Sequence, residues 1–436
     1  METNRVGNLR FGALERFGCL LLMLISVGCA GIFALWATFV YQRSDSKAYE
    51  APAVVALAKS DDVVFDVPPA TATSGMSPSA VVIPASTSTP HPAPSPTSTP
   101  TPTNTPTLVP TATATSAPPP TLPPPVDVSQ GQAFLASMNH EYQKLNNCGP
   151  VSLAAAASFF GAEITQFDAA DVVKGSPEDR NVSPHEMVDY LHSLGLGAVY
   201  RVNGNEALMK QLLANDLPVI VHQWLVRPHD GVLVGHYRVL RGYDEGQGYF
   251  IANDPYTGPQ LTIPYAQFEE WWRPFNRGYI PVYRPEQEAL VATILGEDWD
   301  EGANHQRALA QAEAETQSLA DGYAVFNLAD EYLALGDLTA AVEAYDRAFA
   351  FEFPDHFLWY QFGPLEAFNR VGRYQQVLDI TDTVIANAGE LEEARLQRGV
   401  AYLGLGDPAA ARAEIEKALA ANPRYERAAV ALQNLE

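Results

Sequence analysis

The spacing of apolar and polar positions divides the chain into regions of different character. Residues 17–40 form an apolar run of 24 residues without a charged side chain. Residues 67–125 also lack charge but are rich in Pro, Ser and Thr. Residues 131–286 mix short strand-like apolar runs with helical periodicity, and residues 323–436 show helical periodicity alone. The pattern predicts a multidomain chain: a transmembrane helix, a disordered linker, an α+β domain and an all-α domain.

The apolar run is long enough to cross a bilayer as a helix. Three arginines precede it with only two acidic residues among them, which favours a cytoplasmic N-terminus. We therefore expect a cytoplasmic segment at 1–16, a single transmembrane helix at 17–41, and extracellular or extracytoplasmic domains after it. A cleaved signal peptide and a lipoprotein signal ending at Cys29 are the alternatives, and either would also export the chain.

The segment 42–130 is predicted to be a disordered Pro/Ser/Thr-rich linker. Between Ser86 and Pro125 there are 14 Pro and 17 Ser or Thr in 40 residues. Such a composition cannot bury an apolar core and favours extended polyproline II structure. The linker would hold the folded domains away from the membrane.

Overall charge restricts the class of partner. The chain has 27 basic and 51 acidic side chains, a formal net charge of −24. A charge of this sign and size repels phosphate backbones, so no nucleic acid partner is expected. The membrane contact is expected through 17–41 alone.

Cys148 is the only cysteine outside the apolar run, which holds the other two. It therefore lacks an intramolecular disulfide partner and is a buried apolar residue, an intermolecular bridge or a nucleophile. Gly149-Pro150 and the apolar stretch that follows predict a helix that begins at Cys148 and stops at Gly161. A helix N-terminus stabilises a thiolate, which favours the nucleophile.

A nucleophilic thiol needs a base and a group that orients it. Residues 235–258 predict two strands joined by a Gly-rich turn, with His236 at the start of the first and Asp254 at the end of the second. In an antiparallel pair these ends lie side by side, so the carboxylate can orient the imidazole. His222 is the alternative base. The remaining candidates are predicted to lie at the surface or in the turn: His185, His192, His229 and Asp244.

Three segments, QKLNNCGPVSL, GHYRVLRGYD and IANDP, resemble the Cys, His and Asp blocks of the bacteriocin-processing, double-glycine-type cysteine peptidases of the papain-like superfamily. The resemblance covers 131–286. It implies that Cys148 attacks, His236 acts as general base and acid, Asp254 orients His236, and Gln143 contributes to the oxyanion hole. No metal-ligand spacing, phosphate loop or dinucleotide fingerprint occurs, so no cofactor is expected.

Other local signals fit an α+β domain. Ser183 and Glu186 form a capping box that predicts a helix start. An amphipathic segment at 265–273 is predicted to pack Phe268, Trp271 and Trp272 against the sheet. A final strand, YIPVYR, would end the domain near Pro285.

The last region resembles about three tetratricopeptide repeats, the second of them divergent. Gly336, Gly372 and Gly406 recur at intervals of 36 and 34 residues within helical pairs. We expect a helical connector at 287–322 and the repeats at 323–436. Their concave face is predicted to bind a protein partner; alternatively, the repeats pack against the preceding domain or dimerise.

Together these features predict a membrane-anchored extracytoplasmic cysteine peptidase that hydrolyses a peptide or protein through Cys, His and Asp. The alternatives are a catalytically inactive papain-like binding module and a thiol acyltransferase. Because every candidate catalytic residue precedes the repeats, the repeats are expected to recruit substrate without taking part in the site.

Overall fold

The computed structural model describes residues 131–144, 146–177 and 179–435. Three predictions concern residues outside these ranges: the cytoplasmic segment at 1–16, the transmembrane helix at 17–41 and the linker at 42–130. Among the residues that the structure describes, no helix combines the length and the apolar character needed to span a bilayer.

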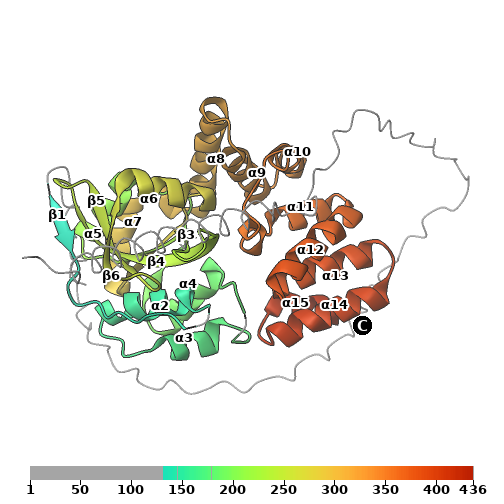
Figure 1. The fold of residues 1–436 in the computed structure, drawn as a ribbon, viewed down its shortest axis with the longest axis horizontal. Helices are drawn as coiled ribbons and strands as arrows, with labels where there is room; N and C mark the ends of the chain where they lie inside the picture. Colours follow the sequence, from blue (N-terminus) through green and yellow to red (C-terminus); the bar gives the residue numbers. More distant parts are fainter. Residues whose placement is uncertain (1–130, 145, 178, 436) are drawn as a thin grey trace, which may run out of the picture. The chain divides into compact units, whose positions relative to one another are not determined.

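A seven-stranded antiparallel sheet forms the centre of the first domain (Figure 1). Its strand order is β2-β7-β3-β4-β5-β6, and β1 pairs with β4 outside this path. The central strands are rich in Val, Ile, Leu and Tyr that are buried on both faces, as expected where helices cover a sheet. The strands are β1 Gln132–Phe134, β2 Gly197–Ala198, β3 Val219–Val226, β4 Leu233–Asp244, β5 Tyr249–Asp254, β6 Gly258–Pro264 and β7 Tyr279–Tyr283.

The predicted hairpin corresponds to β4 and β5. Asp244 pairs with Tyr249 beside the turn, and the register shifts by one residue between Leu240 and Gly242. β4 begins three residues before His236, because β3 pairs with it as far as Val226. The hairpin is therefore confirmed, but its first strand is longer than expected.

Helices pack on the sheet and enclose its apolar core (Figure 1). The helix that begins at Cys148 is buried from Gly149 to Ala157, and Gly161 follows it with φ +90°. The predicted capping box at Ser183 is present, and Phe268 and Trp272 are fully buried as expected. The helices of this domain are α2 Cys148–Phe159, α3 Gln166–Val173, α4 Pro184–Ser193, α5 Glu206–Ala214, α6 Tyr265–Trp272, and the 3₁₀ turns η1 Arg273–Phe275 and η2 Pro285–Gln287.

The rest of the described chain is helical, as predicted. Gly336, Gly372 and Gly406 lie in the turns of three successive helical pairs, each with φ between 81° and 84°, a conformation that a Cβ would disfavour. The middle pair departs most from the pattern, because its first helix has only eight residues. The elements are α7 Glu288–Leu295, η3 Gly296–Trp299, α8 Glu301–Ser318, α9 Gly322–Ala334, α10 Leu338–Ala348, η4 Phe357–Trp359, α11 Gly363–Arg370, α12 Tyr374–Ala388, α13 Glu392–Gly404, α14 Pro408–Ala421 and α15 Glu426–Gln433.

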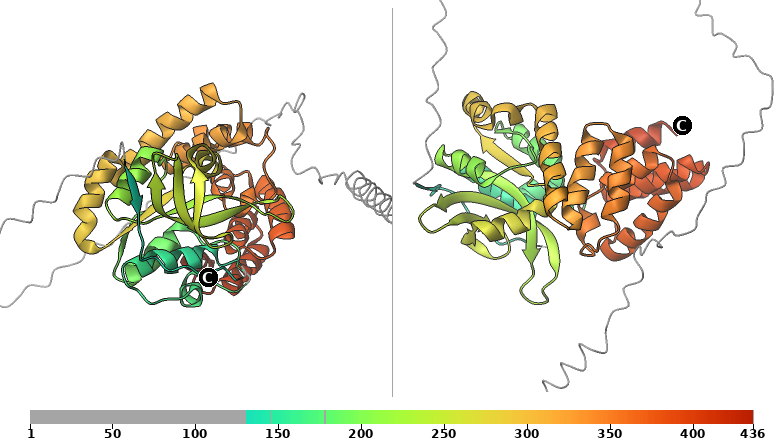
Figure 2. Two further views of the ribbon diagram at one scale, coloured as in Figure 1. Left: turned by 60° about the vertical axis from the view of Figure 1, so that its left-hand side comes forward. Right: turned by 90° about the horizontal axis from the view of Figure 1, so that it is seen from above.

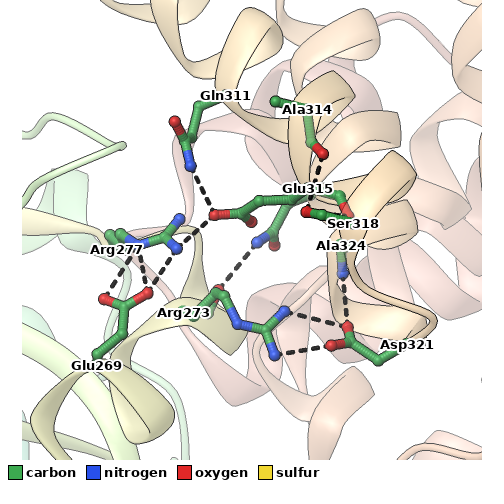
Figure 3. Close-up of polar contacts among 10 residues, drawn as sticks. Glu269, Arg273, Arg277, Gln311, Ala314, Glu315, Ser318, Asp321 and Ala324 are labelled. Carbon is green, nitrogen blue, oxygen red and sulfur yellow. Dashed lines mark hydrogen bonds and ion pairs between the residues drawn. The ribbon is translucent and has the colours of Figure 1, made fainter. Parts of the chain in front are cut away.

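Apolar and ionic contacts join the sheet domain to the helical region. Trp224 and Phe275 belong to the same apolar cluster as residues of the repeats, including Phe357. Figure 3 shows two arginines of the sheet domain that contact acidic side chains around the connector: Arg273 pairs with Asp321 at 2.8 Å, and Arg277 contacts both Glu269 and Glu315. The two views in Figure 2 show the helical region, drawn from gold to red, following the sheet domain along the chain.

Candidate active site

Cys148 is the first residue of α2, as predicted. The loop before it is held by Gln166, a buried side chain of α3. Gln166 donates to Glu141 Oε2 and to the carbonyl of Tyr142, and it accepts from the main-chain N–H of Lys144. These bonds fix the path of the chain into α2 and so fix the position of the thiol.

The structure brings His236 and Asp254 together with Cys148. Nε2 of His236 lies 3.3 Å from Oδ2 of Asp254, and these side chains are 2% and 0% exposed. Nε2 has no hydrogen-bond partner among the described residues, so this is an ion-pair contact. His236 also interacts directly with the thiol of Cys148. Because Nε2 of His236 faces the carboxylate, its other ring nitrogen, Nδ1, is the one available to the thiol.

Arg238 also holds Asp254, and it was not identified from the sequence. Its Nε lies 2.5 Å from the same Oδ2 that contacts His236. The other oxygen, Oδ1, accepts from the main-chain N–H groups of Tyr256 and Thr257. A signal for Arg238 did exist: it is a charged residue inside the otherwise apolar strand HYRVL.

The electrostatics favour a charged thiol and imidazole. Burial opposes ionisation of Cys148, but the hydrogen bond and charge of His236 and main-chain N–H groups outweigh burial and lower the pKa of the thiol. Burial would lower the pKa of His236, but Asp254 and Cys148 raise it. Burial likewise opposes ionisation of Asp254, yet His236 and Arg238 hold the pKa of this carboxyl well below its usual range. Both shifts move the pair towards a thiolate beside an imidazolium.

Gln143 lies at the same end of the site. Its main-chain N–H donates to the carbonyl of Pro255 at 2.8 Å, which ties it to the residue after Asp254. Its contribution to an oxyanion hole stays a prediction.

His222, the alternative base, is less suited to this role. Its ring stacks on Tyr237 and Phe275, with centroids 4.4 and 3.8 Å away. Burial, and then the charge of His236, lower the pKa of His222 to about 3, so it stays neutral. The other candidates are placed as predicted: His185, His192 and His229 are exposed, and Asp244 accepts a hydrogen bond within the turn.

A side chain from the repeats closes the space around the thiol. Cys148 borders a cavity of about 10 Å³, which is also lined by Gly235, Tyr237 and Tyr360. The Tyr360 ring lies so close to Gly235 that a Cβ there would come within 2.6 Å of it. The expectation that the repeats take no part in the site is therefore wrong. Sequence patterns gave no signal for Tyr360, because the contact depends on how distant segments pack.

Comparisons with known proteins agree with this architecture. Residues 132–280 match the Peptidase C39 like family, and residues 323–352 and 392–425 match the tetratricopeptide repeat. The middle helical pair, divergent in sequence, falls outside the repeat match. A comparison with curated proteins found no match.

Solved structures similar to parts of the chain include peptidase and repeat proteins. The peptidase domain of Streptococcus ComA, a bifunctional ABC transporter of a quorum-sensing pathway, is 19% identical (TM-score 0.28; 34% of this chain and 99% of that chain covered). A double-glycine-motif protease from an AMS/PCAT transporter, in complex with the leader peptide, is also 19% identical (TM-score 0.27; 36% and 99% covered). MamA from Desulfovibrio magneticus RS-1 is 19% identical (TM-score 0.27; 30% and 74% covered).

Two known families thus match separate parts of the chain. One matches the sheet domain, with its cysteine at a helix N-terminus, and the other matches the helical pairs that follow. The chain contains a Peptidase C39-like domain followed by tetratricopeptide repeats.

Proposed function

We propose that the sheet domain is a cysteine peptidase in which Cys148 is the nucleophile, His236 the general base and acid, and Asp254 the orienting group. The observation that carries this proposal is the buried His236–Asp254 pair beside a thiol at the first residue of a helix. Buried groups whose pKa values are shifted by a specific charged partner are frequent at catalytic sites, and a nucleophilic thiol requires such a base beside it.

The chemistry follows from these positions. The Cys148 thiolate attacks the carbonyl carbon of a peptide bond, and the oxygen gains negative charge next to the N-terminus of α2. His236 then gives its proton to the leaving amine, which departs and leaves a thioester on Cys148. Water attacks the thioester after His236 removes its proton, and the acid product leaves. Gln143 is proposed to donate to the oxyanion.

Asp254 keeps Nδ1 of His236 turned to the thiol, and Arg238 keeps Asp254 ionised. Buried carboxylates of this kind need a cation or several N–H donors, and Asp254 has both. Arg238 is thus a positioning residue that acts through Asp254.

A peptidyl probe with a thiol-reactive group tests the proposal. We expect it to label Cys148 in the full chain, and we expect Cys148→Ala to abolish both labelling and peptide hydrolysis. Asp254→Asn should lower the rate roughly 10²- to 10⁴-fold, because general acid–base catalysis contributes about that much. His229→Ala, at an exposed histidine outside the site, is the matched control.

Two outcomes would replace this function with another. Labelling by a small alkylating agent without hydrolysis of any peptide would support an inactive binding module. Transfer of the acyl group to an added amine in preference to water would support a thiol acyltransferase, because both reactions share the thioester.

We also propose that this peptidase faces the outside of the cell, anchored by residues 17–41, and that the repeats recruit a protein substrate or partner. The uncharged span and the arginines before it support the anchor. The repeat family supports recruitment, since stacked helical pairs form extended binding surfaces.

A further inference from the structure

A cleft of about 640 Å³ lies between the sheet domain and the repeats and adjoins the small cavity at Cys148. Its volume is typical of ligand-binding sites. Four residues line both spaces: Asn181, His222, Tyr237 and Tyr360. The cleft therefore lies directly beside the cavity at the thiol.

The walls of this cleft carry six carboxyl groups and two arginines. Within the described ranges, no cleft carboxylate forms an ion pair with Lys or Arg, whereas Glu331 pairs with His305. The two arginines that line the cleft are engaged elsewhere: Arg427 pairs with Glu366, and Arg424 donates to the carbonyl of Lys174. The cleft carboxylates are Glu186, Asp189, Asp330, Glu331, Glu393 and Glu426.

Two buried polar atoms on the cleft wall lack partners among the described residues. His222 is 8% exposed, and its Nε2 has no hydrogen-bond partner. Glu393 accepts from Asn181 through Oε1, whereas its buried Oε2 accepts nothing. Buried polar atoms normally have a hydrogen-bond partner, so these two atoms indicate that polar groups of a ligand bind here.

Several of these carboxyls are kept from ionising by their surroundings. Burial, together with the neighbouring charge of Glu331, raises the pKa of Asp330 to about 7. Burial and then nearby carboxylates raise the pKa of Glu393 well above its usual range. A cation bound next to either carboxyl would offset the rise in its pKa.

We propose that the cleft binds an extended segment of the substrate that carries a Lys or Arg side chain, with its cation among the cleft carboxylates. This names the substrate class of the peptidase proposed above and rests on that function. The four residues shared with the Cys148 cavity place this segment close to the bond to be cleaved. The carboxyl groups of the wall outnumber its arginines, which favours a cation, and Glu393 Oε2 can bind the donors of that cation.

Binding tests the cleft without depending on catalysis. Full-length Cys148→Ala is titrated with pools of short peptides that hold Arg, Gln or Glu at one position and are randomised elsewhere. At positions that lie in the cleft, the Arg pools should bind roughly 10- to 100-fold more tightly than the Glu pools, and this preference should weaken with salt.

Charge-neutralising variants assign the preference to the cleft. In the same background, Asp189→Asn with Glu426→Gln, and separately Glu393→Gln, should reduce the preference for Arg. Asp171→Asn with Glu416→Gln removes the same charge from exposed positions outside the cleft and should leave the preference intact.

The outcomes separate this inference from the proposed function. Arg-selective binding without hydrolysis by the unmodified chain would support the cleft and overturn the peptidase. Hydrolysis without selectivity for Arg would leave the peptidase standing and overturn the cleft inference. Failure of every pool to bind, or a preference that survives in the cleft variants, would also overturn the inference.

Discussion

At the scale of single residues, one oxygen of Asp254 serves two cations. Oδ2 contacts Nε2 of His236 at 3.3 Å and Nε of Arg238 at 2.5 Å. The negative charge of Asp254 is therefore balanced by the positive charge of Arg238 even when His236 is neutral. This arrangement allows His236 to lose and regain a proton without leaving an unpaired buried charge.

The thiol of Cys148 is expected to titrate below an ordinary cysteine, because the interaction with His236 outweighs burial. His236→Gln removes that interaction and leaves burial, so the pKa of Cys148 should rise. The rate of alkylation by iodoacetamide as a function of pH measures the pKa of Cys148 in the unmodified chain and in the variant. Mass spectrometry of the peptide that contains Cys148 separates its alkylation from that of Cys19 and Cys29. A midpoint at or above that of an ordinary thiol, or one unchanged in the variant, would contradict this assignment.

At the scale of elements, the start of α13 lies against the segment before α4. Asn181 donates to Glu393 Oε1 at 2.6 Å, and Arg424 donates to the carbonyl of Lys174. Glu392 and Glu393, the two glutamates of α13, lie near other acidic side chains here. Among the described residues, neither glutamate forms an ion pair with a cationic side chain. Burial first, and then mutual repulsion, raise the pKa of Glu392 to about 7 and that of Glu393 well above its usual range.

This contact should make the stability of the protein fall as pH rises. Between the ordinary glutamate pKa and about 7, the unfolded chain has released the Glu392 proton and the folded chain has not. Folding then takes up a proton, so the free energy of unfolding decreases with increasing pH across this window. We expect a smaller difference in Tm between about pH 5 and about pH 8 in Glu392→Gln than in the unmodified chain.

Glu392→Gln keeps an acceptor for Asn422 Nδ2, so the variant removes the charge without removing the hydrogen bond. Glu416→Gln, at an exposed glutamate of α14, is the control and should retain the full difference. An unchanged pH dependence in Glu392→Gln would show that this contact does not contribute to it.

At the scale of the whole molecule, the repeats form part of the site as well as any recruiting surface. Tyr360 lines the cavity at Cys148, and Trp224 and Phe275 pack in the apolar cluster of the repeats. Removal of the repeats would expose these aromatic side chains to water. A truncated sheet domain is therefore not expected to behave as an independent small-peptide hydrolase.

The predicted anchor and linker make an exported topology testable. Protease added to intact cells should cut within 42–130, since a segment of this composition is expected to bury no core, and should release the folded domains. A cytoplasmic marker protein in the same cells must stay intact for the result to count. Full protection of the folded domains would contradict the topology.

Local signals were sufficient for much of the fold and for the three residues of the proposed catalytic site. The helix start at Cys148, the capping box at Ser183 and the Gly turns of the repeats depend on neighbouring residues, so they could be predicted. The hairpin placed His236 near Asp254 for the same reason: its short turn determines which ends meet. The short strand β6 was missed, because its apolar alternation is weak.

The sequence by itself therefore determined that a Peptidase C39-like domain precedes tetratricopeptide repeats, and it identified the thiol and its proposed partners. Only the tertiary structure decided that Arg238 shares Asp254, that Tyr360 closes the space at Cys148, and that acidic side chains of both domains line one cleft. The physical reason is separation along the chain. Helix caps and turns are set by residues a few positions apart, whereas burial, ion pairing and pKa depend on which distant segments pack together.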